Sequence, residues 1–186
     1  NIVNQFLLTN LLFLMVLYKK YHVSIGSNIG DRLENIQSSL DLIHSRIASL
    51  TGISCIYESE SIGFDGDDFY NICASFFSNI SPHLVMQQLL EIEKTLGRNR
   101  SDETKYISRI IDIDILLIED LVIDSEELKV PHPEMCNRRF VMEPLIEIDP
   151  NLIHPVSKVS LKEIHETFDQ NQKIQKKDLV LNNPGN

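Results

Sequence analysis

The sequence has few of the residues that mark several protein classes. It contains no Trp, and only 7 Gly and 7 Pro are spread over 186 residues, of which 42% are hydrophobic. This composition excludes collagen-like and low-complexity chains and is sufficient to bury a core. Basic residues are also scarce, since 17 Lys and Arg stand against 27 Asp and Glu, a net charge of −10. Nucleic acids and anionic membranes require a net basic face, so we expect neither as a partner.

Cysteine is rare as well. Cys55, Cys73 and Cys136 are separated by long, irregular intervals, with no CxxC pair and no Cys/His ligand spacing. Structural zinc sites require such spacing. We therefore expect the three thiols to pack as small apolar side chains in a reducing, cytoplasmic compartment.

No apolar run reaches the roughly 20 residues that a membrane-spanning helix requires. The apolar stretch at residues 6–17 has no basic residue before it, as a secretory signal would have. We expect neither a membrane span nor a secretory signal. We hypothesise that Met15 is the natural start, with residues 1–14 as upstream sequence or an extension, and that residues 1–20 lie outside the fold.

Hydrophobic periodicity predicts the main elements. Apolar residues from Leu33 to Leu50 recur at alternating steps of three and four, the period of an amphipathic helix, and Ser81-Pro82 starts a second such stripe. Segments rich in β-branched and aromatic residues are typical of strands. The expected elements, in chain order, are a strand over 21–28, a helix over 33–50, strands over 53–60 and 69–78, a helix over 82–96 and a strand over 109–118.

This order, β, α, β, β, α, β, predicts an α+β, ferredoxin-like sheet covered on one face by two helices, as a single domain over residues 21–168. The tract at 121–154 is rich in proline and predicts loops and short turns. We expect a short helix over 161–168 and a polar, frayed tail over 169–186.

Asp112 and Asp114 are the most informative pair of residues. They lie two positions apart in the strand expected over 109–118, so both project to the same face of the sheet. Like charges this close repel, and a divalent cation between them relieves the repulsion. Carboxylate oxygens suit Mg²⁺, which completes its coordination with water and phosphate oxygens. A solvated strand face paired with Lys or Arg is the alternative, and the pair alone does not decide between the two.

The arginines favour the metal and phosphate interpretation. Five of the seven Arg residues fall between positions 98 and 139, around the acidic pair. A guanidinium group binds phosphate oxygens in pairs, so this cluster predicts a basic pocket for phosphate in an acidic protein. Surface salt bridges are the expected role of Arg32, Arg46 and Arg139.

The common phosphate-binding loops are missing. Neither GxxxxGK[ST] nor GxGxxG occurs, and for the Gly-rich turn at 26–30 a structural role is favoured over phosphate binding. The six His residues show no ligand spacing. His132 is distinctive because Pro131 and Pro133 flank it and would fix the direction of its imidazole.

Five sequence blocks occur in a fixed order: IGSNIGDR (25–32), FYN (69–71), EIEKTLGRNR (91–100), SRIIDIDILL (108–117) and VPHPEMCNRRFVMEPLIEI (130–148). Together they resemble the 6-hydroxymethyl-7,8-dihydropterin pyrophosphokinases of folate biosynthesis, over about residues 21–168. The resemblance implies a ferredoxin-like fold. It also implies transfer of the β,γ-pyrophosphoryl unit of ATP to the hydroxymethyl oxygen of the pterin, which leaves AMP.

The resemblance implies an ATP side of the site. Asp112 and Asp114 match aspartates that hold two Mg²⁺ ions and the ATP phosphates, and Arg98 and Arg109 match arginines that bind the triphosphate and stabilise the transferring group. These four are the expected catalytic residues. The other positions matched on the nucleotide side are Glu93, Arg100, His132 and Arg138.

The resemblance also implies a pterin side. Asn71 matches a residue that hydrogen-bonds the pterin edge, and Phe140 matches a ring that stacks on it. Phe69 stands where many members carry Tyr, and Tyr106 stands where some carry Trp, in a loop over 98–108 that we expect to close over ATP. The other wall positions are Ser59 and Ile62.

These features predict a monomeric, cytoplasmic, Mg²⁺-dependent enzyme whose substrates are small molecules. We expect catalysis by positioning and electrostatic stabilisation, without a strong protein base. A catalytically silent ferredoxin-like binding module is one alternative. A different metal-dependent transferase or nuclease that uses the acidic pair is another.

Overall fold

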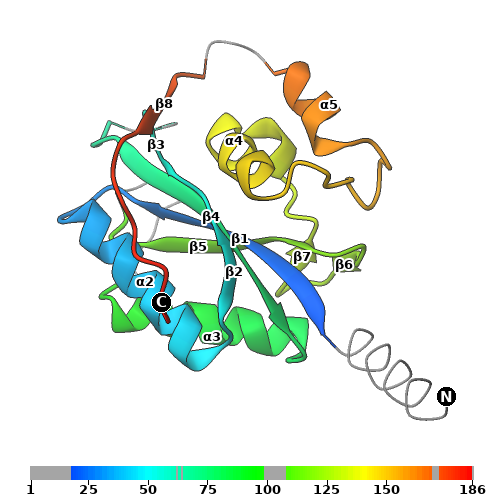
Figure 1. Cartoon of the computed structure of the whole chain (residues 1–186), viewed down its shortest axis with the longest axis horizontal. Coiled ribbons are helices and arrows are strands. Elements are labelled where there is room, and N and C mark those ends of the chain that lie inside the picture. The colour runs from blue at the N-terminus through cyan, green and yellow to red at the C-terminus, as the bar shows by residue number, and fades with distance from the viewer. Residues whose placement is uncertain (1–17, 62, 64, 99–107, 169–171, 186) are drawn as a thin grey trace, which may run out of the picture.

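The computed structural model describes residues 18–61, 63, 65–98, 108–168 and 172–185. Its centre is a six-stranded antiparallel sheet in the order β5-β1-β4-β3-β8, with β2 also paired to β4 (Figure 1). The elements are β1 (Lys19–Ser27), α2 (Arg32–Arg46), β2 (Leu50–Ile53), β3 (Ile56–Ser59), β4 (Phe69–Ser78), α3 (Pro82–Thr95), β5 (Asp112–Ile118), β6 (Ile123–Asp124), β7 (Lys129–Val130), a 3-10 turn (Met135–Asn137), α4 (Arg139–Ile148), α5 (Leu161–Glu166) and β8 (Ile174–Lys177).

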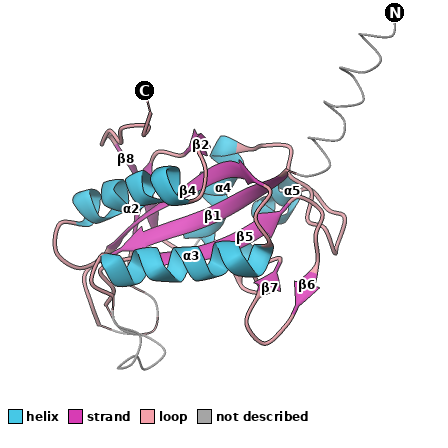
Figure 2. Ribbon diagram, turned by 90° about the horizontal axis from the view of Figure 1, so that it is seen from below, coloured by secondary structure: helices cyan, strands magenta, loops and turns pink. Residues whose placement is uncertain are grey.

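The sheet is covered by helices on both faces. α2 and α3 lie side by side on one face, where Ile36 of α2 and Leu89 of α3 pack with apolar side chains of the sheet such as Ile113 (Figure 2). α4 lies on the other face, where Met142 and Leu145 pack with Cys73 and Leu117 of the sheet in a second cluster, and α5 packs against α4. The predicted α+β, ferredoxin-like fold is confirmed, but the prediction that helices cover only one face is incomplete because it omits α4.

α4 corrects the prediction of loops and short turns over 121–154. A proline inside a helix costs about 3 kcal/mol because it lacks an N–H donor and its ring crowds the preceding turn, and Pro144 lies within α4. Val141, Met142 and Leu145 are buried on one side of this helix, and burying an aliphatic side chain of this size contributes about 1.5–3 kcal/mol. The buried face therefore outweighs the proline.

The helix expected over 33–50 ends at Arg46, and Leu50 already belongs to β2. The strand expected over 53–60 corresponds to the last residue of β2 and to β3. Ser54 lies between them, where its N–H donates to the Cys73 carbonyl at 2.9 Å and its Oγ accepts from the Cys73 N–H at 3.0 Å. A side-chain oxygen thus replaces a backbone carbonyl and interrupts the ladder. The strand expected to begin at residue 109 begins instead at Asp112.

The expected outer boundaries of the domain are also corrected. Lys19 and Lys20 already pair with β4 in strand β1, so the fold begins before residue 21. Residues 1–17, and with them the hypothesis about Met15, lie outside the described residues. Among the residues that the structure does describe, no helix is long and apolar enough to cross a membrane.

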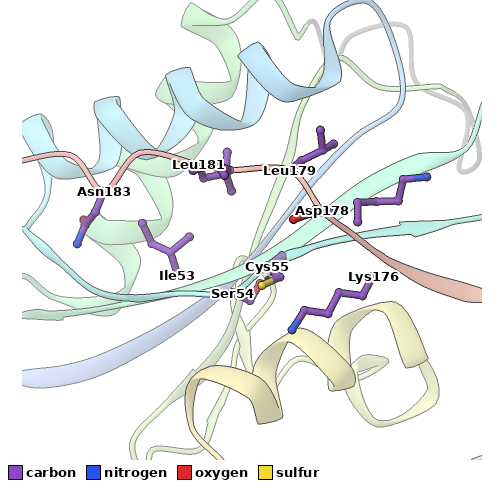
Figure 3. Close-up of a pocket in the computed structure, with 10 residues that line it drawn as sticks. Ile53, Ser54, Cys55, Lys176, Asp178, Leu179, Leu181 and Asn183 are labelled. Carbon is purple, nitrogen blue, oxygen red and sulfur yellow. Dashed lines mark hydrogen bonds between the residues drawn. The ribbon is translucent and has the colours of Figure 1, made fainter.

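The C-terminal segment is not a frayed tail. β8 pairs with β3 from Ile56↔Lys177 to Ser59↔Ile174. Beyond it the chain crosses beside α2, where the Asn182 N–H donates to Gln37 Oε1 at 2.8 Å. A cavity of about 760 Å³ lies between this segment and residues 53–55 (Figure 3). The C-terminal segment is therefore packed against the sheet edge and α2.

Candidate functional site

The site forms where α3 and β5 meet. α3 is followed by Gly97, whose φ of +98° is the left-handed conformation that glycine adopts most readily at the end of a helix. This turn directs Arg98 back toward β5, and the Arg98 N–H donates to the Glu93 carbonyl at 3.0 Å. A buried guanidinium group is thereby placed beside the first residue of β5.

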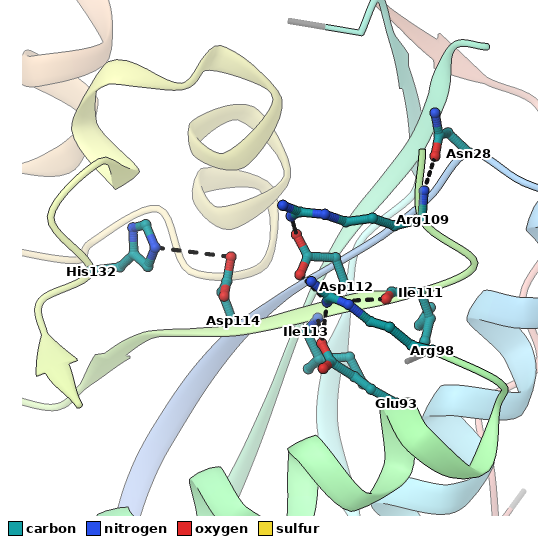
Figure 4. Close-up of polar contacts among 9 residues, drawn as sticks. All are labelled: Asn28, Glu93, Arg98, Arg109, Ile111, Asp112, Ile113, Asp114 and His132. Atoms are coloured by element: carbon teal, nitrogen blue, oxygen red, sulfur yellow. Dashed lines mark hydrogen bonds and ion pairs between the residues drawn. The ribbon is translucent and has the colours of Figure 1, made fainter. Parts of the chain in front are cut away.

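Asp112 is bound by two arginines. Its Oδ1 accepts a short hydrogen bond from Arg98 Nη1, and its Oδ2 accepts from Arg109 Nη1 at 2.5 Å (Figure 4). The Arg98 side chain is 4% exposed, whereas the Arg109 side chain is 24% exposed. Arg98 is therefore fixed in the protein, and Arg109 reaches the surface of the site.

Glu93 holds Arg98 from the opposite side. Its carboxylate is 2% exposed, and Oε1 accepts from Arg98 Nη1 and from the Ile113 N–H, both at 2.7 Å. A buried charge is tolerated only when it is paired and hydrogen-bonded. Glu93 meets both conditions and ties α3 to β5 through the same arginine that contacts Asp112.

The charge state of Asp112 follows from these contacts. Burial raises the pKa of this carboxyl group, but the charges and hydrogen bonds of Arg98 and Arg109 outweigh that effect and hold the pKa below its ordinary value. Asp112 is therefore ionised at neutral pH, as a metal ligand must be.

Asp114 projects from the same side of β5 as Asp112 (Figure 4). His132 Nε2 lies 3.9 Å from Asp114 Oδ2. His132 Nδ1 accepts from the Glu134 N–H at 3.1 Å, so the proton of a neutral imidazole lies on Nε2, the atom that faces Asp114. Burial lowers the pKa of His132 and outweighs the opposing charge of Asp114, which favours this neutral form.

The glycine-rich turn after β1 has a role that the sequence prediction missed. Asn28 is 1% exposed, its Oδ1 accepts from the Arg109 N–H at 2.6 Å, and its own N–H donates to the Arg109 carbonyl at 3.0 Å. The favoured structural interpretation of this turn is consistent with these contacts. The sequence signal that could have indicated this role is an Asn directly after a strand and opposite a basic loop.

The residues matched to the pterin side gather at the neighbouring strands. Asn71 of β4 is 5% exposed and donates from Nδ2 to Ser59 Oγ at 3.0 Å. Gly26 pairs with Asn71 across β1 and β4. A Cβ on Gly26 would lie 3.2 Å from Asn71 Oδ1 and 3.6 Å from Phe69 Cδ1, so glycine provides the space that these side chains occupy.

Phe140 is the second residue of α4, and the Arg138 guanidinium lies 5.9 Å from the centre of its ring.

Two of the expected surface salt bridges are present, from Arg139 Nε to Glu143 at 2.5 Å and from Arg32 Nη1 to Glu58 at 3.2 Å. The third is corrected, because the contact of Arg46 is a hydrogen bond of 3.3 Å to the neutral Thr95 hydroxyl.

Three residues expected near the site, Ile62, Arg100 and Tyr106, lie outside the described residues. Among the residues that the structure describes, no cluster of three or more Asp, Glu, His or Cys could hold a metal ion. A cation here would thus have to take its remaining ligands from water and a substrate, which is the usual arrangement for Mg²⁺ with one or two carboxylates.

Comparisons with known proteins show which family the chain belongs to. The profile of the family described as 7,8-dihydro-6-hydroxymethylpterin-pyrophosphokinase (HPPK) matches residues 22–150. A 2-amino-4-hydroxy-6-hydroxymethyldihydropteridine pyrophosphokinase of Aquifex aeolicus is 37% identical over 143 residues, which cover 76% of this chain and 88% of the relative. The corresponding enzyme of Bacillus subtilis is 37% identical over 129 residues, 68% of this chain and 76% of the relative.

Solved structures show the same fold. The crystal structure of Plasmodium falciparum HPPK-DHPS superposes with a TM-score of 0.64 at 14% identity, covering 80% of this chain and 44% of that one. The chain thus spans less than half the length of that protein. At this identity the likeness concerns the fold alone.

The fold and the site together define an α+β protein in which two arginines converge on a carboxylate at the start of a sheet strand. The chain belongs to the 7,8-dihydro-6-hydroxymethylpterin-pyrophosphokinase family. It is a pyrophosphokinase of folate biosynthesis, and ATP is the co-substrate in this family. The resemblance stated from the sequence is confirmed.

Proposed function

We propose that the chain transfers the pyrophosphoryl unit of ATP to the hydroxymethyl oxygen of 6-hydroxymethyl-7,8-dihydropterin, and that Asp112 and Asp114 hold two Mg²⁺ ions for this reaction. The observation that carries the proposal is the position of Asp112, between Arg98 and Arg109 and on the same side of β5 as Asp114. This is an arrangement for binding cations and phosphate oxygens together.

The donor set fits magnesium. Two carboxylates on one strand face supply hard oxygen ligands, and the low pKa of Asp112 keeps it ionised. When bound, the two ions would neutralise the triphosphate and stabilise charge on the oxygen that leaves with AMP. Arg98 and Arg109 now bind Asp112. Once a metal ion is coordinated by that carboxylate, their positive charges would be available to bind phosphate.

The two arginines have different tasks. Arg98 is buried, and its Nη1 donates to Glu93 Oε1 at 2.7 Å and to the Ile111 carbonyl at 3.2 Å. These contacts hold its guanidinium charge in a fixed position. The guanidinium of Arg109 is more exposed, while Asn28 anchors its backbone. It can turn from Asp112 toward a phosphate without moving the strand. Fixed donors aimed at developing charge are the main source of catalysis in phosphoryl transfer.

His132 lies beside Asp114, and Arg138, just before α4, is near enough to His132 for its charge to lower the pKa of that imidazole. Neutral His132 would donate from Nε2 to Asp114 or to a phosphate oxygen. Arg138 would contact the nucleotide from the same segment. Arg100 remains a predicted contact of the same kind.

The pterin would lie beside β4 and the start of α4. Asn71 would hydrogen-bond its edge, Phe140 would stack on its ring, and Ser59 and Phe69 would form the wall. Ile62 remains a predicted wall residue. Aromatic stacking combined with a buried amide suits a flat heterocycle with donors and acceptors along one edge.

The proposal includes a monomer acting in the cytoplasm. All three cysteines lie in the described residues and none forms a disulfide, which is consistent with a reducing compartment. Gel filtration with light scattering would test the oligomeric state, for which a mass of 21.4 kDa is expected.

One assay tests the function. The full chain is incubated with ATP, Mg²⁺ and 6-hydroxymethyl-7,8-dihydropterin, and AMP and ADP are measured separately. We expect AMP release that depends on the pterin and that stops when Mg²⁺ is chelated. ADP release would indicate an ordinary kinase, and no release would favour a silent binding module, so either result would overturn the proposal.

A further inference from the structure

The C-terminal segment reaches the pterin side of the site. It lies beyond residue 150, where the family match ends. Because β8 pairs with β3 in the register Ser59↔Ile174, the residues just before β8 lie beside the end of β3 (Figure 1). Those residues are Gln172 and Lys173.

Gln172 binds the start of α4 by three hydrogen bonds. Its Oε1 accepts from the Arg139 N–H at 2.8 Å, its Nε2 donates to the Asn137 carbonyl at 2.9 Å, and its own carbonyl accepts from Arg139 Nη1 at 3.2 Å. These contacts join two parts of the chain that are 33 to 35 residues apart.

The first of these bonds acts as a helix cap. The first N–H groups of a helix have no partner within it and are normally bound by the side chain of the preceding residue. Arg138, the residue before α4, makes no such side-chain bond. Gln172 supplies the acceptor instead, and Phe140 follows the capped Arg139 directly in the chain.

The same residues enclose a cavity of about 270 Å³. Its lining includes Ser59 and Glu60 from the end of β3, Arg139 and Phe140 from α4, and Gln172 and Lys173. Lys173 Nζ bonds Glu60 Oε1 at 2.9 Å on the exposed rim. The cavity is close to the lower limit for small-molecule pockets, and two of its lining residues, Ser59 and Phe140, are predicted pterin contacts.

We propose that Gln172 is a positioning residue for the pterin. By capping α4 it holds the Phe140 ring in place across the cavity from Ser59, and the segment before β8 forms the third wall of the pterin pocket. This inference rests on the proposed function. It adds a residue outside the family match to the substrate side of the site.

The test compares Gln172→Ala with Gln175→Ala in the full chain. Gln175 is an exposed residue of the same type within β8, so it controls for a general effect on the strand. Loss of the side-chain bonds should raise the KM for 6-hydroxymethyl-7,8-dihydropterin by about three- to tenfold. The KM for ATP should stay unchanged, and the urea midpoint should fall only slightly, as expected for the loss of one helix cap. Gln172→Glu keeps the acceptor for Arg139 and should show a smaller increase.

An equal pterin KM in the two alanine variants would overturn the inference. A parallel rise in both KM values together with a lower urea midpoint would also overturn it, because that result indicates a purely structural role. If the unmodified chain gave no pterin-dependent AMP, the proposed function would fail by itself. Amide hydrogen exchange at residues 139–142 would then decide the positioning claim, which requires faster exchange in Gln172→Ala and unchanged exchange in Gln175→Ala.

Discussion

Asn28 and Arg109 are joined by a reciprocal pair of hydrogen bonds. The Arg109 N–H donates to Asn28 Oδ1 at 2.6 Å, and the Asn28 N–H donates to the Arg109 carbonyl at 3.0 Å. The end of β1 thus fixes the backbone of an arginine whose guanidinium contacts Asp112. A turn that carries no charge thereby positions a charged group of the site.

Replacing Asn28 should therefore reduce activity through Arg109. Asn28→Ala removes the acceptor for the part-buried Arg109 N–H, which costs about 1 kcal/mol or more. We expect kcat to fall by roughly tenfold or more, measured by AMP release at saturating substrates. Asn28→Asp keeps the acceptor for Arg109 but loses the Nδ2 donor to the Asp67 carbonyl and Ser108 Oγ, so it should retain only part of the activity. A wild-type kcat in Asn28→Ala would show that the turn does not position Arg109.

Glu93→Ala should destabilise the protein. Glu93 is buried and accepts from both Arg98 and the Ile113 N–H, and removing one partner of a buried ion pair costs about 3–5 kcal/mol. Urea unfolding measures this loss. Glu91→Ala on the same helix is the control, because the Glu91 side chain is 67% exposed and should contribute less than about 0.5 kcal/mol. Equal midpoints for the two variants would contradict the pairing.

Gly26→Ala should weaken pterin binding selectively. The new methyl group would lie 3.2 Å from Asn71 Oδ1, and crowding of this kind costs about 1 kcal/mol or more when the neighbour must shift. We expect the pterin KM to rise by roughly fivefold, with the KM for ATP unchanged. An unchanged pterin KM would mean that Asn71 does not contact the substrate.

Stability should fall below neutral pH because of His22. This residue is 1% exposed, and burial, helped by the charge of Lys20 and opposed by Asp149, lowers its pKa from 6.5 to about 4. As the pH falls, this imidazole therefore binds its proton at a higher pH in the unfolded chain than in the folded chain. The stabilisation is complete above about pH 6.5 and is lost as the pH falls toward about 4.

We expect this residue to account for a loss of about 2 kcal/mol in the free energy of unfolding between pH 7 and pH 5. Urea unfolding at the two pH values measures it. His22→Gln should reduce the loss, whereas His83→Gln, at an exposed position of α3, should not. If the loss were the same in both variants, burial of His22 would not be its cause.

The sequence predicts the central elements well because their signals are local. Residues 69–78 are rich in β-branched and aromatic side chains, as is typical of a strand, and they form β4 over the same range. The two-residue spacing of Asp112 and Asp114 predicts that they share one face of the sheet. α4 was missed because Pro144 and its neighbours suggest turns, and only contact with the sheet shows that its apolar face outweighs the proline.

The long-range contacts of the site are the part that sequence patterns cannot give. Gln172 caps a helix more than 30 residues earlier in the chain, and Asn28 anchors an arginine 81 residues away. Neither pairing leaves a local pattern, because each depends on which strands become neighbours. The polar composition of residues 169–186 suggests a frayed tail, although four of these residues form a strand of the sheet.

The fate of the β-phosphate tests the central claim most directly. ATP labelled with ³²P at the β-position is mixed with excess enzyme, Mg²⁺ and 6-hydroxymethyl-7,8-dihydropterin, and the labelled products are separated after a single turnover. Transfer of a pyrophosphoryl unit at the Asp112 and Asp114 site predicts that the label moves to the pterin. Asp112→Ala and Asp114→Ala should slow this step by on the order of 10³-fold, and Asp124→Ala, at an exposed hairpin aspartate, should not. Label recovered in ADP, or near-normal transfer in both site variants, would contradict the account.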